Sequence, residues 1–484
     1  MVVIEASPAG TRRVSAAVAA AGLSSFALLY APQPVLPQLA TAFRLDPGTA
    51  SLAIGVATGA LAVAVLPLAW LAGRVGRRRV ILWSVLGSAM IGLLLPLAPS
   101  FPALLAMRAV QGVAIAGFAG VAAAYLADQL GTARLAAAVG AMIAGNSVGG
   151  MTGRLGVGFA TGPLGWQGAL AVVAGVSLVC ALFAALALPR THHTPDPLSP
   201  EPAPAPDGRA QAIGTGRSPE PASDRGPQTI EAGRSAEAAG AAETDGAMEA
   251  HGTMETAKAM ETARAVETGR LAATVTLERA PESGGRRRLG AGLLTPLAVG
   301  ALGMGSFVAL YNAAGFRLSA PPLSLTPAAA SLIFLAYAMG TASSAAAGRL
   351  TSLWGRTPAL VTALIVTVAG SAMTLHGSLA VIAAGLAVLT AGFFAAHTIA
   401  NAWVAADAPP HARGRAAGLY TLCYYLGSGA GGTAGSIVYG HAGWAWLIAT
   451  TSVWLLLATL AVLATTRRGR RLTTGCVRAS RSAT

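Results

Sequence analysis

The stretch that decides the fold is Gly73-Arg74-Val75-Gly76-Arg77-Arg78-Arg79, a short basic segment interrupted by glycines. It lies between two apolar runs, residues 50–72 and 80–98, neither of which contains a charged residue. A helix that crosses a bilayer needs about 20 predominantly apolar residues. Loops on the cytoplasmic side of a membrane are enriched in lysine and arginine. The stretch is therefore predicted to be a cytoplasmic turn between two membrane-spanning helices.

The composition of the whole chain agrees with a membrane protein. Of the 484 residues, 54% are hydrophobic and only 11% are charged, whereas soluble domains carry about 25% charged residues. Six apolar runs of bilayer length precede Arg190 and six follow Leu289. The predicted spans are 14–36, 50–72, 80–98, 101–127, 135–160, 167–189, 290–313, 326–348, 358–376, 378–405, 415–438 and 442–466.

The loop arginines indicate the orientation of the chain. With the N-terminus in the cytoplasm, these arginines fall on the cytoplasmic side, except for Arg44 and Arg317. This asymmetry predicts a multi-pass protein of the cell inner or plasma membrane with both termini in the cytoplasm. A basic excess can also indicate nucleic-acid binding, but these arginines stand at the ends of apolar runs, so we expect no nucleic-acid partner.

The segment 190–289 interrupts the pattern of spans. Within it, residues 191–285 hold 15 of the 19 acidic and 8 of the 33 basic residues of the chain. Such a polar composition buries too little apolar surface to fold, so we expect a disordered cytoplasmic linker. The predicted organisation is a cytoplasmic tail at 1–13, a six-helix bundle at 14–189, the linker at 190–289, a second six-helix bundle at 290–466 and a cytoplasmic tail at 467–484.

The two bundles repeat each other in sequence. Gly76-Arg77 recurs 279 positions later as Gly355-Arg356, and Tyr30 is matched with Tyr311 at a shift of 281. Five glycines and a tryptophan keep one shift of 278: Gly140, Gly149, Gly153, Gly162, Gly165 and Trp166 recur as Gly418, Gly427, Gly431, Gly440, Gly443 and Trp444. Parallel repeats of this kind are typical of alternating-access transporters. We therefore expect an all-α membrane protein whose twelve transmembrane helices form two pseudo-symmetric six-helix bundles.

Ionisable residues inside the spans are rare. The acidic residues outside the linker, Glu5, Asp46, Asp128 and Asp407, all lie in tails or at the ends of spans, so a carboxylate proton relay is not expected. The embedded ionisable residues are Arg108, Arg154 and His397.

Without an acidic partner, a buried arginine must use carbonyl groups, amide side chains, water or an anionic ligand. Two interpretations of Arg108 remain open: it braces spans 1, 4 and 5 through backbone carbonyls and glutamines, or it contacts substrate or a proton path. His397 titrates near neutral pH, and it either packs in the core or takes part in coupling.

Aromatic and amide side chains could line a central cavity, because pockets for small organic molecules are mostly apolar with few polar groups. Phe316, Phe393, Phe394 and Tyr425 belong to this wider set. The predicted cavity residues are Tyr30, Gln33, Arg108, Gln111, Asn146, Arg154, Tyr311, Asn312, His397, Asn401 and Tyr424.

The cytoplasmic ends of the spans carry a second predicted site. Asp128 and Asp407 each close an even-numbered span beside basic loops, which positive-inside topology alone does not explain. We predict a duplicated gate whose ion pairs form while the cytoplasmic side is closed. Its residues are Arg74, Gly76, Arg77, Arg78, Asp128, Arg134, Gly355, Arg356, Asp407 and Arg413.

Several motifs resemble the major facilitator superfamily, and the resemblance covers both bundles but not the linker. Residues 69–80 resemble its loop motif between spans 2 and 3, with Ala69 and Gly73 in place of glycine and aspartate. Residues 104–112 resemble its Arg-x-x-Gln-Gly motif in span 4, and residues 145–150 its antiporter motif in span 5. The strings 30–34, 149–155 and 311–318 resemble a bacterial branch of arabinose-efflux-like permeases.

This resemblance implies a secondary active transporter, not an enzyme, that exports small drug-like or sugar-like compounds by alternating access. Its expected partners are the lipid bilayer and a small-molecule substrate, with protons as the candidate coupling ion. We expect a monomer without a cofactor or metal. Two alternatives stay open: uptake or facilitated diffusion of a small anionic metabolite, and a transporter-like sensor or scaffold that signals through the linker.

Overall fold

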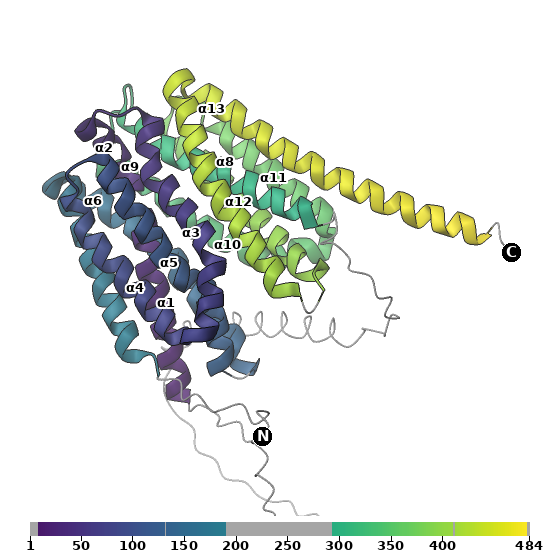
Figure 1. The fold of residues 1–484 in the computed structure, drawn as a ribbon. Helices are drawn as coiled ribbons and strands as arrows, with labels where there is room; N and C mark the ends of the chain where they lie inside the picture. Colours follow the sequence, from purple (N-terminus) through teal and green to yellow (C-terminus); the bar gives the residue numbers. More distant parts are fainter. Residues whose placement is uncertain (1–7, 131, 190–292, 410–411, 482–484) are drawn as a thin grey trace, which may run out of the picture. The chain divides into compact units, whose positions relative to one another are not determined.

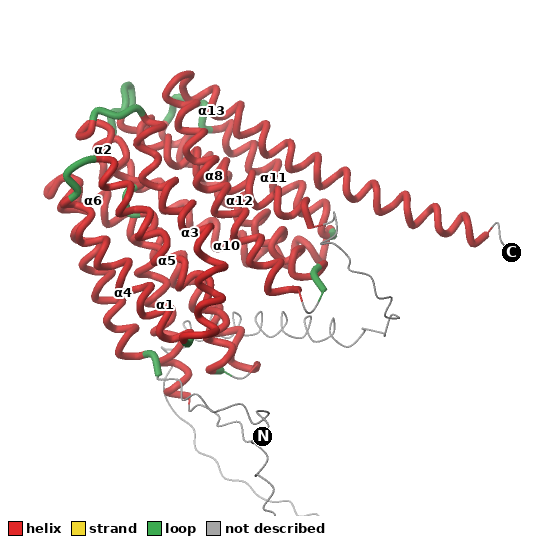
Figure 2. The backbone as a smooth tube through the Cα atoms, in the orientation of Figure 1, coloured by secondary structure: helices red, strands yellow, loops and turns green. Residues whose placement is uncertain are grey.

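A computed structural model describes residues 8–130, 132–189, 293–409 and 412–481, and the secondary structure of these residues is helical (Figures 1 and 2). The predicted linker lies outside them. The helices of the first half are α1 (Pro8–Tyr30), η1 (Gln33–Val35), α2 (Leu36–Phe43), α3 (Pro47–Val75), α4 (Arg77–Leu94), η2 (Leu95–Leu97), α5 (Phe101–Gln129) and α6 (Thr132–Ala187). Those of the second half are α8 (Leu294–Ser319), α9 (Pro327–Ser331), η4 (Leu332–Ala336), α10 (Tyr337–Trp354), α11 (Arg356–Met373), α12 (Leu379–Asp407) and α13 (Arg413–Arg481).

Ten helical segments of the described chain are long and apolar enough to cross a membrane. Two of them, in α6 and α13, contain 51 and 54 residues, which is more than twice the length that a bilayer needs. Each contains one glycine with left-handed backbone, Gly165 (φ 66°) or Gly443 (φ 80°). The chain folds back at Gly165. The two arms of α6 are in contact, since a Cβ atom on Gly156 would lie 3.3 Å from the Val173 side chain. Divided at these glycines, the helices provide the twelve predicted crossings.

Local sequence explains where the helices begin and end. Gly76 (φ 96°) separates α3 from α4, and Gly355 (φ 84°) separates α10 from α11, so the opening basic stretch and its repeat are tight turns. We call the end of the halves that carries these two turns the arginine-rich side, and the other end the opposite side. On the opposite side, Asp46 caps α3 by accepting a hydrogen bond from the Thr49 N–H at 3.0 Å.

Most helices extend beyond the predicted apolar spans, because polar residues continue a helix into the interfacial layer. The seventh span was predicted at 290–313, but α8 ends at Ser319; residues 290–292 lie outside the described part. In the last turn of α8, Arg317 donates to the His376 carbonyl at 3.1 Å, which ties the end of the helix to the loop between α11 and α12. α1 begins at Pro8 and α13 continues to Arg481, so helix occupies much of both predicted tails.

The glycine ladders bring helices into close contact in the same way in both halves. A Cβ atom on Gly149 would lie 2.5 Å from the Leu23 Cα, and one on Gly427 would lie 2.7 Å from the Ala301 Cα. The other glycines of each ladder likewise contact the residue 126 positions earlier in the chain. These contacts are made by Gly145 and Gly153 in the first half and by Gly431 and Gly435 in the second. Small residues allow such approach of membrane helices.

This packing corrects one predicted correspondence. Since contact partners are 126 residues apart in both halves, the shift of 278 that relates Gly165 to Gly443 must also relate α1 to α8. Tyr30 and Tyr311 are 281 apart and are therefore not equivalent. The three-residue error arises because a single tyrosine match fixes no helical register.

Buried apolar side chains form two clusters. The larger runs through the whole first half and includes residues of the second half toward the opposite side, such as Phe307 and Leu447. The smaller contains second-half residues toward the arginine-rich side, such as Ala359 and Trp403. The two halves therefore share one core on the opposite side and have separate cores on the arginine-rich side.

Candidate functional site

A chain of buried polar side chains connects the two halves. Arg154 on α6 donates from Nε to Gln33 Oε1 at 2.6 Å, and Gln33 Nε2 donates to Asn312 Oδ1 on α8 at 2.7 Å. Arg154 also donates from Nη1 to the Gly150 carbonyl at 2.7 Å. The three side chains are at most 2% exposed. The structure thus brings together three predicted cavity residues, two from the first half and one from the second.

Aromatic rings surround the Arg154 guanidinium. Its Cζ atom lies 4.1 Å from the ring centroid of Tyr30, 4.6 Å from that of Tyr337 and 5.2 Å from that of Phe334. Tyr30 belongs to the first half, whereas Phe334 and Tyr337 belong to η4 and α10 of the second. The faces of aromatic rings attract cations, most strongly where water is excluded. The guanidinium is therefore held between the halves by hydrogen bonds and rings.

Arg108 has a different environment, although it is also fully buried. Its Nε donates to the Ala53 carbonyl at 2.7 Å, and its Nη1 and Nη2 donate to the carbonyls of Leu28 and Leu29 at 3.1 and 2.5 Å. Nη1 also donates to the side chain of Gln111, whose Nε2 donates to Ser88. Arg108 thus braces α1, α3, α4 and α5 of the first half. These contacts agree with the interpretation of Arg108 as a brace. The braced helices differ from the predicted ones, because α3 and α4 take the place of the fifth span.

A network of aromatic rings fills the second half beside this site. Tyr311 shares a hydrogen bond of 2.7 Å with Thr390 and packs 5.4 Å from Tyr337, measured between ring centroids. His397 lies farther along α12, where Nδ1 is 2.9 Å from the Tyr420 hydroxyl and the ring is 4.6 Å from that of Tyr424. The predicted residues Tyr311, His397 and Tyr424 thus belong to one aromatic network.

Two predicted cavity residues lie apart from these contacts. Asn401 is exposed one turn beyond His397. Asn146 packs against Gly22 of α1, and its Oδ1 is buried without a hydrogen-bond partner.

Sequence reasoning missed Phe334, Tyr337 and Tyr420. The signal for Tyr337 was available, since it is a lone large polar ring in the small-residue stretch Ala336-Tyr337-Ala338-Met339-Gly340.

The predicted gate residues form ion pairs within each half. Arg77 pairs with Asp128 between α4 and α5, and Arg356 pairs with Asp407 between α11 and α12 at 3.0 Å. The second pair is reinforced by Trp403, whose Nε1 donates to Asp407 at 2.7 Å. Both pairs connect neighbouring helices of one half and do not bridge the halves. A gate that forms and breaks between the halves stays a prediction for these residues.

The other gate residues also contact their own half. Arg78 donates to the carbonyls of Leu188 and Ala185 at the end of α6, at 3.1 and 3.2 Å. Arg134 donates to Thr11 of α1 at 3.2 Å. Arg74 lies over the ring of Trp70 at 3.7 Å, and Arg413 is exposed at the start of α13. These contacts hold the arginine-rich end of the first half together.

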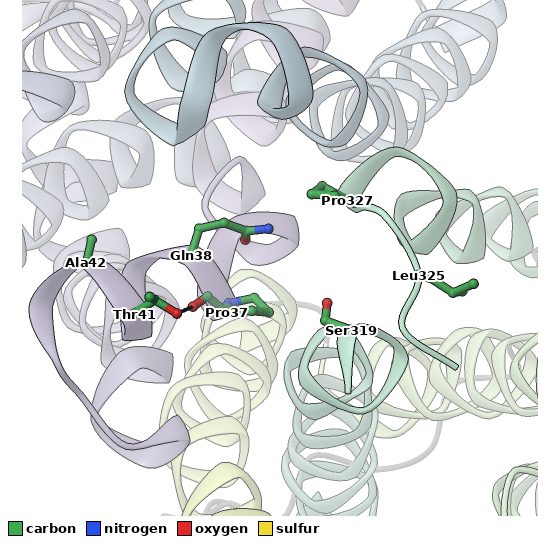
Figure 3. A pocket seen from close by; sticks show the side chains of 7 residues that line it. All are labelled: Pro37, Gln38, Thr41, Ala42, Ser319, Leu325 and Pro327. Carbon is green, nitrogen blue, oxygen red and sulfur yellow. Dashed lines mark hydrogen bonds between the residues drawn. The ribbon is translucent and has the colours of Figure 1, made fainter. Parts of the chain in front are cut away.

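A shallow hollow of about 420 Å³ lies between the halves on the opposite side. It is lined by Pro37, Gln38, Thr41 and Ala42 around α2 and by Ser319, Leu325 and Pro327 of the second half. Figure 3 shows the Gln38 side chain extending toward the space between Ser319 and Pro327. The hollow contains none of the predicted cavity residues and is separate from the buried cluster around Arg154.

Comparison with known proteins identifies the family. The model of the Major Facilitator Superfamily matches residues 18–298 and 299–475. The chain is 32% identical to the inner membrane transport protein YnfM of Escherichia coli K12, over 95% of this chain and 91% of that protein. It is 28% identical to the MFS-type transporter YybF of Bacillus subtilis 168, over 92% of each.

The fold agrees with this assignment. A bacterial homolog of the human lysosomal transporter Spinster, solved in an inward-facing and unoccupied conformation, superposes with a TM-score of 0.67 at 16% identity, covering 95% of this chain and 98% of that chain. With its relatives and its twelve-crossing architecture, the chain is a multi-pass membrane transporter that belongs to the Major Facilitator Superfamily.

Proposed function

We propose that the protein exports small organic compounds by alternating access, with the substrate site between its two halves. The observation that carries this proposal is the distribution of the apolar core, which the halves share on the opposite side and divide on the arginine-rich side. In such a protein the halves are joined at one side and can separate at the other. A rocking motion of the halves would close the second side and open the first. Transporters built from two repeats move in this way.

Contacts within each half support a rigid-body motion. Arg108 ties four helices of the first half through buried carbonyls. The ion pairs Arg77–Asp128 and Arg356–Asp407 each connect neighbouring helices of one half. Rocking leaves all of these contacts intact. What the motion must separate is the cross-half pairing of Gln33 with Asn312 and of Arg154 with the second-half rings, together with part of the apolar core that the halves share on the opposite side.

Export and the location rest on the sequence. The resemblance of residues 145–150 to an antiporter motif supports outward transport. The arginine-rich side supports placement of that side and of both termini in the cytoplasm of a cell inner membrane.

His397 is the proposed proton-coupling residue. Among the described residues of the spans, no carboxylate lies away from the helix ends, and His397 is partly accessible at mid-span beside Tyr420 and Tyr424. An imidazole is a side chain that can bind and release a proton during a transport cycle. A proton that moves inward through this site would drive export of the substrate in the opposite direction.

Inverted membrane vesicles with an acidic interior test this proposal. A panel of fluorescent drug-like compounds and labelled sugars is expected to include one that accumulates in vesicles carrying the protein and not in vesicles without it. His397→Ala should abolish the dependence of accumulation on the pH gradient. His376→Ala is the matched control, because His376 lies in a loop where its ring accepts a hydrogen bond from the Ser378 N–H. Equal initial rates with and without the gradient would instead indicate facilitated diffusion.

A further inference from the structure

The two buried arginines of the first half differ in how their charge is satisfied. Arg108 donates to three backbone carbonyls and one glutamine of its own half, so its hydrogen bonds are internal. Arg154 donates to one carbonyl of its own half, and its other hydrogen-bond partners are Gln33, which is itself tied to the second half, and the Tyr337 hydroxyl of the second half. A buried cation in a membrane needs a compensating partner. Arg154 has the environment in which a ligand can be that partner.

The electrostatic balance of the described spans favours an anion. Their acidic residues Asp128 and Asp407 lie at helix ends, paired with Arg77 and Arg356. Asp46 lies outside the spans, where it caps α3. The region around Arg154 therefore contains a fixed positive charge without a fixed negative one. A cationic substrate would be repelled there, whereas a carboxylate would neutralise the site on entry.

An unpaired polar atom lies at the second-half end of this hydrogen-bonded chain. Asn312 is 1% exposed, and its Nδ2 lacks a hydrogen-bond partner within the described part of the chain. The amide faces α13, because a Cβ atom on Gly432 would lie 3.2 Å from Asn312 Nδ2. Leaving such a donor buried and unpaired costs about 1–3 kcal/mol. An acceptor oxygen of a ligand would satisfy it.

The rings define the rest of the ligand. Tyr30 and Tyr337 lie over the guanidinium from opposite halves, at 4.1 and 4.6 Å. When the halves part, the guanidinium loses its second-half rings and can offer its planar donors to a carboxylate, which arginine binds with two parallel hydrogen bonds. The separated rings then provide apolar faces for a flat organic body.

We propose that Arg154, with Gln33 and Asn312, forms the binding site for an organic anion, a carboxylate attached to a flat apolar body. This assigns a substrate class to the proposed exporter and rests on that function. Arg154 is the specificity-determining residue because it supplies the charge. Tyr30, Phe334 and Tyr337 receive the apolar body.

The test measures binding to the purified full-length protein in nanodiscs, so it does not depend on transport. Benzoate is compared with benzamide, which has the same ring and size without the charge, by titration followed through intrinsic protein fluorescence. Benzoate is expected to bind the wild-type protein at least tenfold more tightly than benzamide. Arg154→Gln should weaken benzoate binding roughly 10- to 100-fold, the effect of losing a hydrogen bond to a charged group, and leave benzamide binding unchanged. Arg154→Lys should retain part of the preference.

Clear results would overturn this assignment. Equal affinity of the wild-type protein for benzoate and benzamide would refute it without any variant, so a poorly folded Arg154→Gln protein cannot obscure the outcome. A preference for benzoate that survives in a folded Arg154→Gln protein would also refute it. Benzoate binding without any flux in vesicles would uphold the anion site and refute the exporter, which keeps the two failures apart.

Discussion

The glycine ladder between α1 and α6 gives a quantitative prediction for Gly149→Ala. The added Cβ atom would lie 2.5 Å from the Leu23 Cα, whereas carbon atoms in contact are about 3.5–4.0 Å apart. The helices must therefore separate by about 1 Å, and overpacking of this kind costs about 1–3 kcal/mol. Alanine also stabilises a helix relative to glycine by about 1 kcal/mol, so the net destabilisation is expected to be about 0–2 kcal/mol.

Gly140→Ala is the matched control, because Gly140 lies on the same helix and a Cβ atom there would have no neighbour within 4 Å. It gains the same helix propensity without the clash, so the difference between the variants isolates the clash at about 1–3 kcal/mol. Thermal unfolding can be followed with a thiol-reactive fluorogenic dye, since Cys180 and Cys423 are free and partly buried. The midpoint temperature of unfolding is expected to be highest for Gly140→Ala, intermediate for the wild type and lowest for Gly149→Ala. Indistinguishable midpoints for the two variants would refute the close contact of α1 and α6.

Three further perturbations test other parts of the structure with the same unfolding assay. Arg108→Leu leaves the carbonyls of Ala53, Leu28 and Leu29 unpaired, so a loss of about 3 kcal/mol or more is expected; a variant as stable as the wild type would contradict the brace. Asp407→Asn should destabilise more than Asp128→Asn, because Asp407 also accepts from Trp403, while the half-exposed pairs themselves contribute less than about 1 kcal/mol. The hydrogen bonds from Thr49 lower the pKa of Asp46 below its ordinary value of 3.8. The cap therefore stabilises the fold fully above pH 3.8, and this stabilisation is lost as pH falls through the lowered pKa. Asp46→Ala should then cost about 1 kcal/mol near neutral pH and little at about pH 2. An equal effect at both pH values would count against the cap.

The crossings could be predicted from the sequence because each depends on local properties, a bilayer-length apolar run with arginines at one end. The turns at Gly76 and Gly355 and the reversals at Gly165 and Gly443 were visible as repeated glycines. The end of α8 was misplaced because the predicted apolar run ends at residue 313, whereas the helix continues through Phe316 and Arg317 to Ser319, and Arg317 there donates to the His376 carbonyl. Pairing between the halves could not be predicted. Gln33 and Asn312 are 279 residues apart, and nothing in either segment specifies the other.

Under the proposed rocking motion, the described contacts that would separate are those between the halves. The ion pairs beside the turns at Gly76 and Gly355 connect helices of one half, so they would stabilise each moving body without opposing the movement. Such a motion would have to open the cross-half cluster and part of the apolar core shared on the opposite side. The polar contacts of the cluster are one neutral hydrogen bond, worth about 0.5–1.5 kcal/mol, and cation–π contacts worth about 2 kcal/mol where water is excluded. A barrier contribution of this size is matched by the two charge-assisted hydrogen bonds that a carboxylate would form with Arg154, at about 1.5–3 kcal/mol each. Binding an anion would therefore replace the polar contacts that opening removes, and under the proposed assignment Arg154 would both connect the halves and select the substrate.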